Sequence, residues 1–161
     1  MNTNFLQNIE FEVSIKRLPY VEFYTQKISL PSISTSPVEQ ANPMNKLFHS
    51  ADKVEYSNLE LSFIIDEDLY NYFELFKWLH DLAFPQENHQ FKNINESEEG
   101  LYSDITLLLK NSNKRTNTLV SFTNCFPIQL SEIQLDTTQQ DIQYPEASAT
   151  FQYDYFGIIQ K

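Results

Sequence analysis

Five segments of this chain place apolar side chains at every second residue, and this period limits the possible folds more than any other feature of the sequence. The segments are residues 9–15, 59–65, 105–109, 118–122 and 147–155. A period of two residues places successive side chains on opposite faces of a β-strand. Each segment is therefore predicted to be a strand with one face in a core. Turn residues at 111–114 predict that two of the strands form a hairpin.

Residues 21–30 form a further extended run, which begins after Pro19 and ends at Pro31. The segment that follows, residues 31–52, shows no clear period and contains three prolines. We predict a loop of about 20 residues there, which is longer than the 12–15 beyond which loops in compact domains are usually functional.

Residues 66–85 contain the one helix that the sequence predicts. Asp66 is a candidate N-cap, Glu67 and Asp68 suit the positive end of the helix dipole, and Pro85 marks the end. The apolar side chains that share one face at helical spacing are Leu69, Tyr72, Phe73, Phe76, Leu79 and Ala83.

This face is expected to pack on the sheet, with Leu69, Phe73 and Phe76 at its centre. Tyr70 and Trp78 lie off the stripe. They indicate either a second packed surface or the ordinary spread of large side chains on an amphipathic helix.

Length and charge narrow the class of protein. The chain has 161 residues, which predicts a single domain over residues 1–161, and its net charge is −11. This balance disfavours a nucleic-acid-binding surface and attachment to an anionic membrane. The two glycines are too few for a glycine-rich phosphate loop. The first residues do not resemble a signal peptide and no apolar run could span a membrane, so we expect a soluble intracellular protein.

The residues that could carry chemistry have simpler structural explanations. Cys125 is the single cysteine and reads as a small buried residue. Asp66 and Asp68 are explained by the helix start rather than by acid–base catalysis. The three histidines are His49, His80 and His89. Their spacing favours surface or interface positions over a metal site. We therefore expect no catalytic residue, no metal and no cofactor.

Together these patterns predict a mainly β fold. We expect two packed antiparallel sheets, as a β-sandwich or barrel, with one flanking α-helix. Such sheets leave edge strands that aggregate unless they are paired or protected, and pairing between subunits would close them.

Several long segments of the sequence are distinctive. In the first half they are RLPYVEFYTQKISLPSIS, NPMNKLF and DKVEYSNLELSFIIDEDLYNYFELFKWLHDLAFP. In the second half they are LYSDITLLLKNSNK and FTNCFPIQLSEIQLDTTQQDIQYPEASATFQY. Together they resemble the tail tube protein family of contractile-tailed bacteriophages over about residues 5–156. One departure is Ser50-Ala51, where the family often carries glycine.

The resemblance implies that the fold assembles as hexameric rings stacked into a hollow tube, with an inner barrel built from neighbouring subunits. It implies that the loop at 31–52 reaches the adjacent ring. The candidate residues for this contact are Pro31, Pro37, Pro43 and Phe48.

The function that the resemblance implies is that of a structural virion protein, a tail tube subunit through which DNA and the tape measure pass. Sheath, baseplate or terminator proteins are the expected partners, and no membrane is expected. The expected location of the protein is the virion tail, after assembly in the host cytoplasm. A tube initiator or tail-completion protein and the tube of a non-viral contractile injection system are alternatives. A monomeric β-sandwich binding module is an alternative from another class.

Strand alternation also selects candidate residues for the channel wall. Glu10 and Glu12 lie opposite the apolar set of their strand and are the first choice for facing the lumen. A solvated outer face is the competing interpretation. In either case we expect a channel in which Lys and Arg are fewer than Asp and Glu, because a basic wall would hold DNA.

Overall fold

The computed structural model describes residues 10–50, 53–83, 100–111, 113–136, 138 and 144–160. Ile9 and Pro85 of the predicted strand and helix lie outside this set. The elements, in chain order, are β1 (Phe11–Ile15), α1 (Pro19–Tyr24), β2 (Thr25–Ser29), β3 (Ile33–Thr35), β4 (Val38–Ala41), β5 (Lys46–His49), β6 (Val54–Tyr56), β7 (Leu59–Ile64), α2 (Tyr70–Ala83), β8 (Ser103–Lys110), β9 (Thr116–Leu130), β10 (Glu146–Gln152) and β11 (Tyr155–Gln160). The prediction of a mainly β protein with antiparallel sheets and a helix is confirmed.

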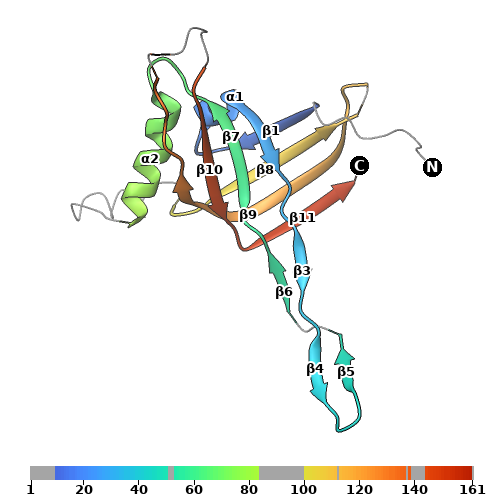
Figure 1. Ribbon diagram of the computed structural model, residues 1–161. Coiled ribbons are helices and arrows are strands. Elements are labelled where there is room, and N and C mark those ends of the chain that lie inside the picture. The colour runs from blue at the N-terminus through green and yellow to red at the C-terminus, as the bar shows by residue number, and fades with distance from the viewer. Residues whose placement is uncertain are drawn as a thin grey trace.

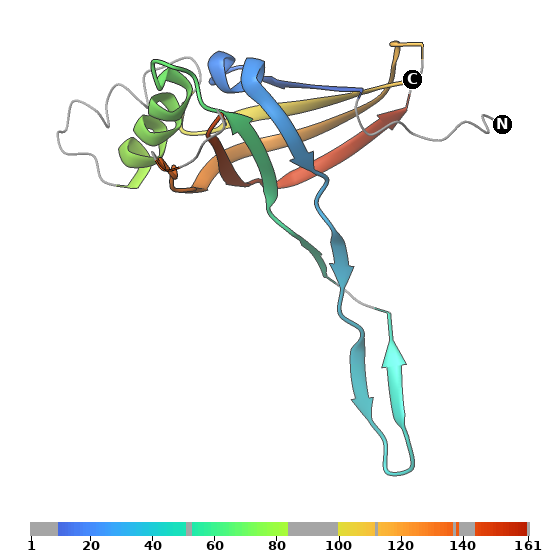
Figure 2. The ribbon, with the colours of Figure 1, turned by 45° about the horizontal axis from the view of Figure 1, so that its top comes forward.

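Seven strands form one antiparallel sheet in the order β1-β8-β9-β10-β7-β2, with β11 on the other side of β9. The 15-residue β9 belongs to two layers. Its first part pairs with β8 and β11, and its last residues pair with β10. The first layer is therefore β1-β8-β9-β11, and the second layer is β9-β10-β7-β2 (Figures 1 and 2).

The corner between the layers lies at Asn124, whose φ is 54°. Asparagine tolerates this left-handed conformation better than most residues. Its side-chain amide donates to Asp154 Oδ2 at 2.7 Å, and its backbone N–H donates to Asp104 Oδ1 at 3.2 Å. The chain changes layer again beside Asp154, between β10 and β11. The prediction of one strand over 147–155 is therefore wrong, because two strands in different layers share that segment.

The core lies between the two layers and is rich in aromatic side chains. Phe63, Phe122 and Phe151 are fully buried. Phe122 contacts Tyr153 edge-on with ring centroids 5.2 Å apart, and the Tyr153 hydroxyl donates to the Ser57 carbonyl at 2.8 Å. The alternation in β7 and β10 places Leu, Phe and Ala inside and Ser, Thr and Glu outside, as expected from the sequence.

Residues 19–24 form helix α1, so the prediction of an extended run over 21–30 is wrong in its first part. Pro19 occupies the start of the helix, where its fixed φ is favourable and its missing N–H is not needed. Val21 is fully buried, and the Glu22 carboxylate accepts the Ile15 N–H at 2.8 Å. The extended conformation begins only at Thr25.

The face of helix α2 that packs against the core is not the face that the sequence predicts. Leu69, Phe73 and Phe76 were expected to pack on the sheet, but they are 46%, 60% and 48% exposed. The buried residues of the helix are Asn71, Leu75 and Trp78.

Trp78 provides the reason for this orientation. Its indole lies 6.1 Å from the Phe151 ring, its N–H donates to the Leu101 carbonyl at 3.3 Å, and the Arg17 guanidinium lies 4.8 Å from the ring centroid. A buried tryptophan removes more apolar area from water than either phenylalanine.

The start of α2 also differs from the prediction, because Asp66 is not its N-cap. Asp66 accepts the adjacent Glu67 N–H within a turn, and Leu69 follows with φ 59°. The side chain of Asn71 closes the turn. It donates to the Ile64 carbonyl at 2.7 Å and accepts the Tyr72 N–H at 2.8 Å.

Residues 31–58 form an arm that projects from the body (Figures 1 and 2), and its residues 51–52 lie outside the described set. The prediction of an irregular loop at 31–52 is wrong in its secondary structure. β3 pairs with β6 and β4 pairs with β5, which makes two antiparallel ribbons in succession. No alternation reveals these strands, because their side chains, apart from half-buried Tyr56 at the end of β6, are exposed within the subunit.

Candidate assembly surfaces

The arm carries apolar side chains that contact little of their own subunit. Met44 is 97% exposed and Phe48 is 62% exposed. The other exposed apolar side chains of the arm are Ile33, Val38, Leu47 and Val54. An extended ribbon with this many uncovered apolar groups is suited to contact another molecule.

The four residues predicted to make the inter-ring contact all lie on the arm. Pro31 lies at its root, Pro37 separates β3 from β4, and Pro43 lies in the distal turn between β4 and β5. Phe48 lies within β5, directly across from Glu39. Whether they touch an adjacent ring stays a prediction.

A second apolar surface covers the outer side of α2 and the adjoining α1. Tyr20 of α1 stacks on Tyr70 of α2 with centroids 6.1 Å apart, and Phe76 stacks on His80 at 5.8 Å. The exposed side chains of this surface are Tyr20, Phe23, Leu69, Tyr70, Phe73 and Phe76. The sequence suggested a second packed surface from Tyr70 and Trp78, and Tyr70 lies on this one while Trp78 lies in the core.

Both layers end in strands with an unpaired edge within the described residues. β1 pairs only with β8, β11 only with β9, and β2 only with β7. Such edges present unpaired N–H and C=O groups that another chain can extend.

The outer face of the first layer combines charge with an apolar row. Glu12, Leu108, Leu119 and Ile159 lie side by side across the four strands. The Lys110 ammonium lies 2.7 Å from Glu12 Oε2. Of the two predicted lumen residues, Glu12 therefore lies on this face.

Glu10 precedes β1 and is half-buried. Its carbonyl accepts the Lys110 N–H at 2.9 Å. It is held beside the first layer by its backbone, and nothing in the subunit alone places it on a channel wall.

The outer face of the second layer is polar throughout its centre. Ser148 lies opposite Ser62, and Thr150 lies between Glu60 and Gln129. The charged side chains here are Glu60, Glu146 and Lys27, with Lys27 Nζ 3.3 Å from Glu146 Oε2. This face thus offers hydroxyl and amide groups and a small acidic excess.

Cys125 is fully buried at the corner of β9, and burial raises the pKa of its thiol to about 12. A raised pKa leaves only about one thiol in ten thousand ionised at pH 8, and the thiolate is the reactive form. We expect no measurable reaction of the folded protein with Ellman's reagent at pH 8, and one thiol per chain to react after unfolding in guanidinium chloride. Rapid reaction of the native protein would contradict this burial.

Two further findings concern only the described part of the chain. No group of three or more His, Cys, Asp or Glu side chains there is arranged to hold a metal ion. None of the helices in the described ranges has the length and apolar character needed to cross a membrane.

Comparison with known proteins identifies the family of this chain. The family model described as phage tail tube protein matches residues 2–159. The chain belongs to the phage tail tube protein family. The resemblance seen in the sequence is thereby confirmed, and the chain is a structural tail tube component, a role that implies no catalysis.

Solved structures of tube-like proteins share the tail tube fold. A chain of the anti-feeding prophage baseplate, in a 6-fold symmetrised reconstruction, is 16% identical with a TM-score of 0.64, over 99% of this chain and 98% of that one. A chain of the sheath-tube complex of an extracellular contractile injection system (PVC) is 18% identical with a TM-score of 0.63, over 99% and 94%. A chain of the tube-terminating cap of the anti-feeding prophage is 17% identical with a TM-score of 0.64, over 100% and 95%. A search of curated proteins finds no match.

Sequence reasoning missed helix α1 and the exposed aromatic side chains that it carries. Tyr20 and Phe23 were placed next to or within a strand, although Pro19 before them is a known helix-start signal. That signal could have identified the short helix and, with it, the aromatic patch shared with Tyr70.

Proposed function

We propose that six copies of this chain close into a ring and that rings stack into the tube through which DNA and the tape measure pass. Membership of the tail tube family carries the proposal. Six-fold symmetry is the symmetry of the anti-feeding prophage baseplate reconstruction, one chain of which shares this fold. Unpaired strand edges support the ring, since closing a sheet on itself removes edges.

The proposed partners follow from the complexes in which the fold occurs. Chains of this fold are found in a baseplate, a sheath-tube complex and a tube terminator of contractile injection systems. We propose that this chain meets a sheath, a baseplate and a terminator in the same way, with assembly in the host cytoplasm. The arm, through Pro31, Pro37, Pro43 and Phe48, makes the contact between rings.

We propose that the outer face of the second layer lines the channel, in place of Glu10 and Glu12. The polar centre of that face, around Ser62 and Ser148, suits contact with water. Glu12 shares its face with Leu108 and Leu119, apolar side chains that are stabilised by contact with protein instead. A hexamer carries 6 × (−11) = −66 formal charges, so pairing and apolar contacts must hold the ring against repulsion.

Charge reversal on the two faces distinguishes these assignments. We expect Glu60→Lys tubes to retain DNA at low salt and to release it as salt rises, because clustered cations bind phosphates with strong salt dependence. Glu12→Lys is the matched control on the other face and is expected to release DNA like the unmodified tube. The measurement is DNA retained by purified tubes across a salt series. Retention by Glu12→Lys alone would assign the channel to the first layer.

The assembly itself is tested with the purified chain by size-exclusion chromatography and negative-stain electron microscopy. Six-fold rings or stacked tubes are the expected result. Compact single subunits at all concentrations would contradict the proposal and favour a monomeric binding module. Rings that never stack without a partner would favour a tube initiator or tail-completion protein.

A further inference from the structure

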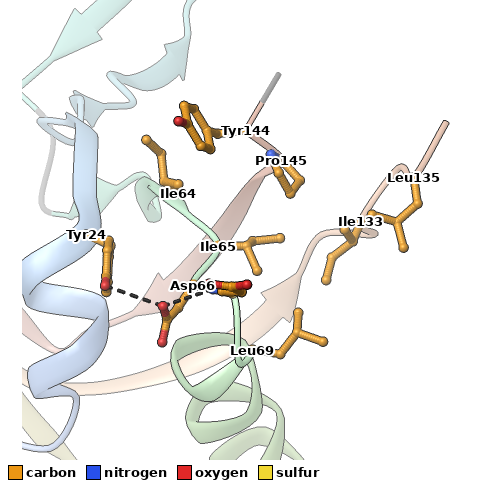
Figure 3. A pocket seen from close by; sticks show the side chains of 10 residues that line it. Tyr24, Ile64, Ile65, Asp66, Leu69, Ile133, Leu135, Tyr144 and Pro145 are labelled. Carbon is orange, nitrogen blue, oxygen red and sulfur yellow. Dashed lines mark hydrogen bonds between the residues drawn. The ribbon is translucent and has the colours of Figure 1, made fainter. Parts of the chain in front are cut away.

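An apolar pocket lies at the end of the second layer that faces away from the arm. Its volume is about 650 Å³. The side chains that form most of its wall are Tyr24, Ile65, Leu69, Ile133, Leu135 and Tyr144 (Figure 3). Leu135 and Tyr144 are 83% and 73% exposed, so among the described residues the pocket is open to an incoming group. We refer to it as the end pocket.

Strand directions fix the position of the end pocket relative to the arm. β7 runs from the arm at Leu59 to the pocket at Ile64, and β2 runs from the pocket at Thr25 back toward the arm. The arm and the end pocket therefore lie at opposite ends of the same two strands. Objects that carry complementary features at opposite ends can join head to tail without closing, which produces an open column.

The chemistry of the arm tip matches that of the end pocket. The tip, residues 42–48 (NPMNKLF), carries four apolar side chains and one cation, Lys46, and Glu39 lies beside it, opposite Phe48. The pocket has apolar walls and two carboxylates, Asp66 and Glu67, and no Lys or Arg among its described lining residues. The Lys46 side chain is 71% exposed although it pairs with Glu39 at 3.0 Å, so it can approach a second carboxylate.

The arm is long enough for this contact. A dozen residues lead from the body to the tip, and at 3.3 Å per residue they extend about 40 Å. The six residues of β7 separate the root of the arm from the end pocket by about 20 Å. The tip can thus reach the end pocket of the next copy for any ring spacing up to about 60 Å.

We propose that the end pocket of each subunit receives the arm tip of a subunit in the adjacent ring. Met44 and Phe48 enter the apolar part, and Lys46 lies near Asp66 and Glu67 at the rim. The inference rests on the stacking of rings proposed above and adds the receiving site.

Disulfide trapping tests the contact in assembled tubes. Met44→Cys with Leu135→Cys introduces one thiol at each end, and buried Cys125 does not interfere. We expect oxidised tubes of this variant to give a ladder of linked chains on a non-reducing gel. Met44→Cys with Asn113→Cys is the matched control, because Asn113 lies in the exposed turn between β8 and β9, and it is expected to give no ladder.

A charge exchange tests the same contact without thiols. Lys46→Glu should raise the protein concentration needed for stacking about 60-fold or more at low salt, because each ring–ring contact loses six exposed ion pairs and each pair is worth about two- to five-fold in affinity. Adding Glu67→Lys should restore it, whereas adding Glu55→Lys on the arm should not. If the cysteine variant does not form stacked tubes under reducing conditions, the Lys46→Glu and Glu67→Lys variants test the arm-to-pocket contact on their own.

The outcomes separate this inference from the proposed function. Normal tubes without a ladder, or with equal ladders in both cysteine pairs, would overturn the arm-to-pocket contact and leave the tube intact. Failure of Glu67→Lys to restore stacking would also overturn it. Absence of tubes from the unmodified chain would overturn the proposed function and, with it, this contact.

Discussion

A variant that lacks Ser34–Phe48 is expected to fold like the intact chain and to form no long tubes. The deleted residues are all exposed and contribute no side chain to the core. Exposed segments contribute little to stability, and a shorter loop changes the closure entropy only slightly. The thermal midpoint of the variant should therefore stay within a few degrees of that of the intact chain, because a change of about 1 kcal/mol in the free energy of unfolding shifts the midpoint by about 2–4 °C in a domain of this size.

The loss of stacking is visible by electron microscopy and by sedimentation of the assembled material. Rings without tubes are the expected product, since the strand edges that we propose to close a ring lie outside the deletion. The intact chain, prepared in parallel, is the control. Long tubes from the deletion variant would contradict the role of the arm.

Trp78→Ala should destabilise the subunit by about 3–5 kcal/mol, the range for removing a large aromatic side chain from a core. Trp78 is 2% exposed, contacts Phe151 and donates a hydrogen bond to the Leu101 carbonyl. Since whole domains are stable by only about 5–15 kcal/mol, this is a large share of the total. Denaturant unfolding of the unassembled subunit measures it.

Phe76→Ala is the matched control on the opposite side of the same helix. Phe76 is 48% exposed, and surface substitutions usually change stability by about 0.5 kcal/mol or less. A loss comparable to that of Trp78→Ala would show that the Phe76 face packs within the subunit after all. If Phe76→Ala lowers the stability of the isolated subunit only slightly but lowers the stability of the assembled tube strongly, the Phe76 face is covered on assembly.

The sequence was most informative where a single strand face is buried. In β1 and β7 the apolar residues alternate, and the structure buries Val13, Ile15, Leu59, Leu61 and Phe63. Alternation works here because one side of each strand meets the core and the other meets solvent. It could not reveal β3, β4 and β5, where both sides are exposed and the hydrogen bonds of each ribbon are made within the arm.

Helix α2 shows why periodicity alone was insufficient. The helix has apolar residues on two faces, and Phe73 and Phe76 made the wrong face look larger. The choice between the faces depends on contacts with residues distant in sequence, such as Phe151 and Leu101. The sequence analysis also overlooked Asn71, which is buried because its side chain hydrogen-bonds to the Ile64 carbonyl at the end of β7 and to the Tyr72 N–H in the helix.

The place where the arm joins the body determines how the subunit bears tension. The arm joins the body through β2 at its start and β7 at its end, and β7 is bonded on one side to β10 over six residue pairs and on the other side to β2. A pull on the arm is therefore shared at once by two ladders whose hydrogen bonds lie across the strand direction. A load along the strands shears many bonds together, whereas a load directed across the strands would peel them one after another. We expect a column joined through these arms to resist stretching along its length.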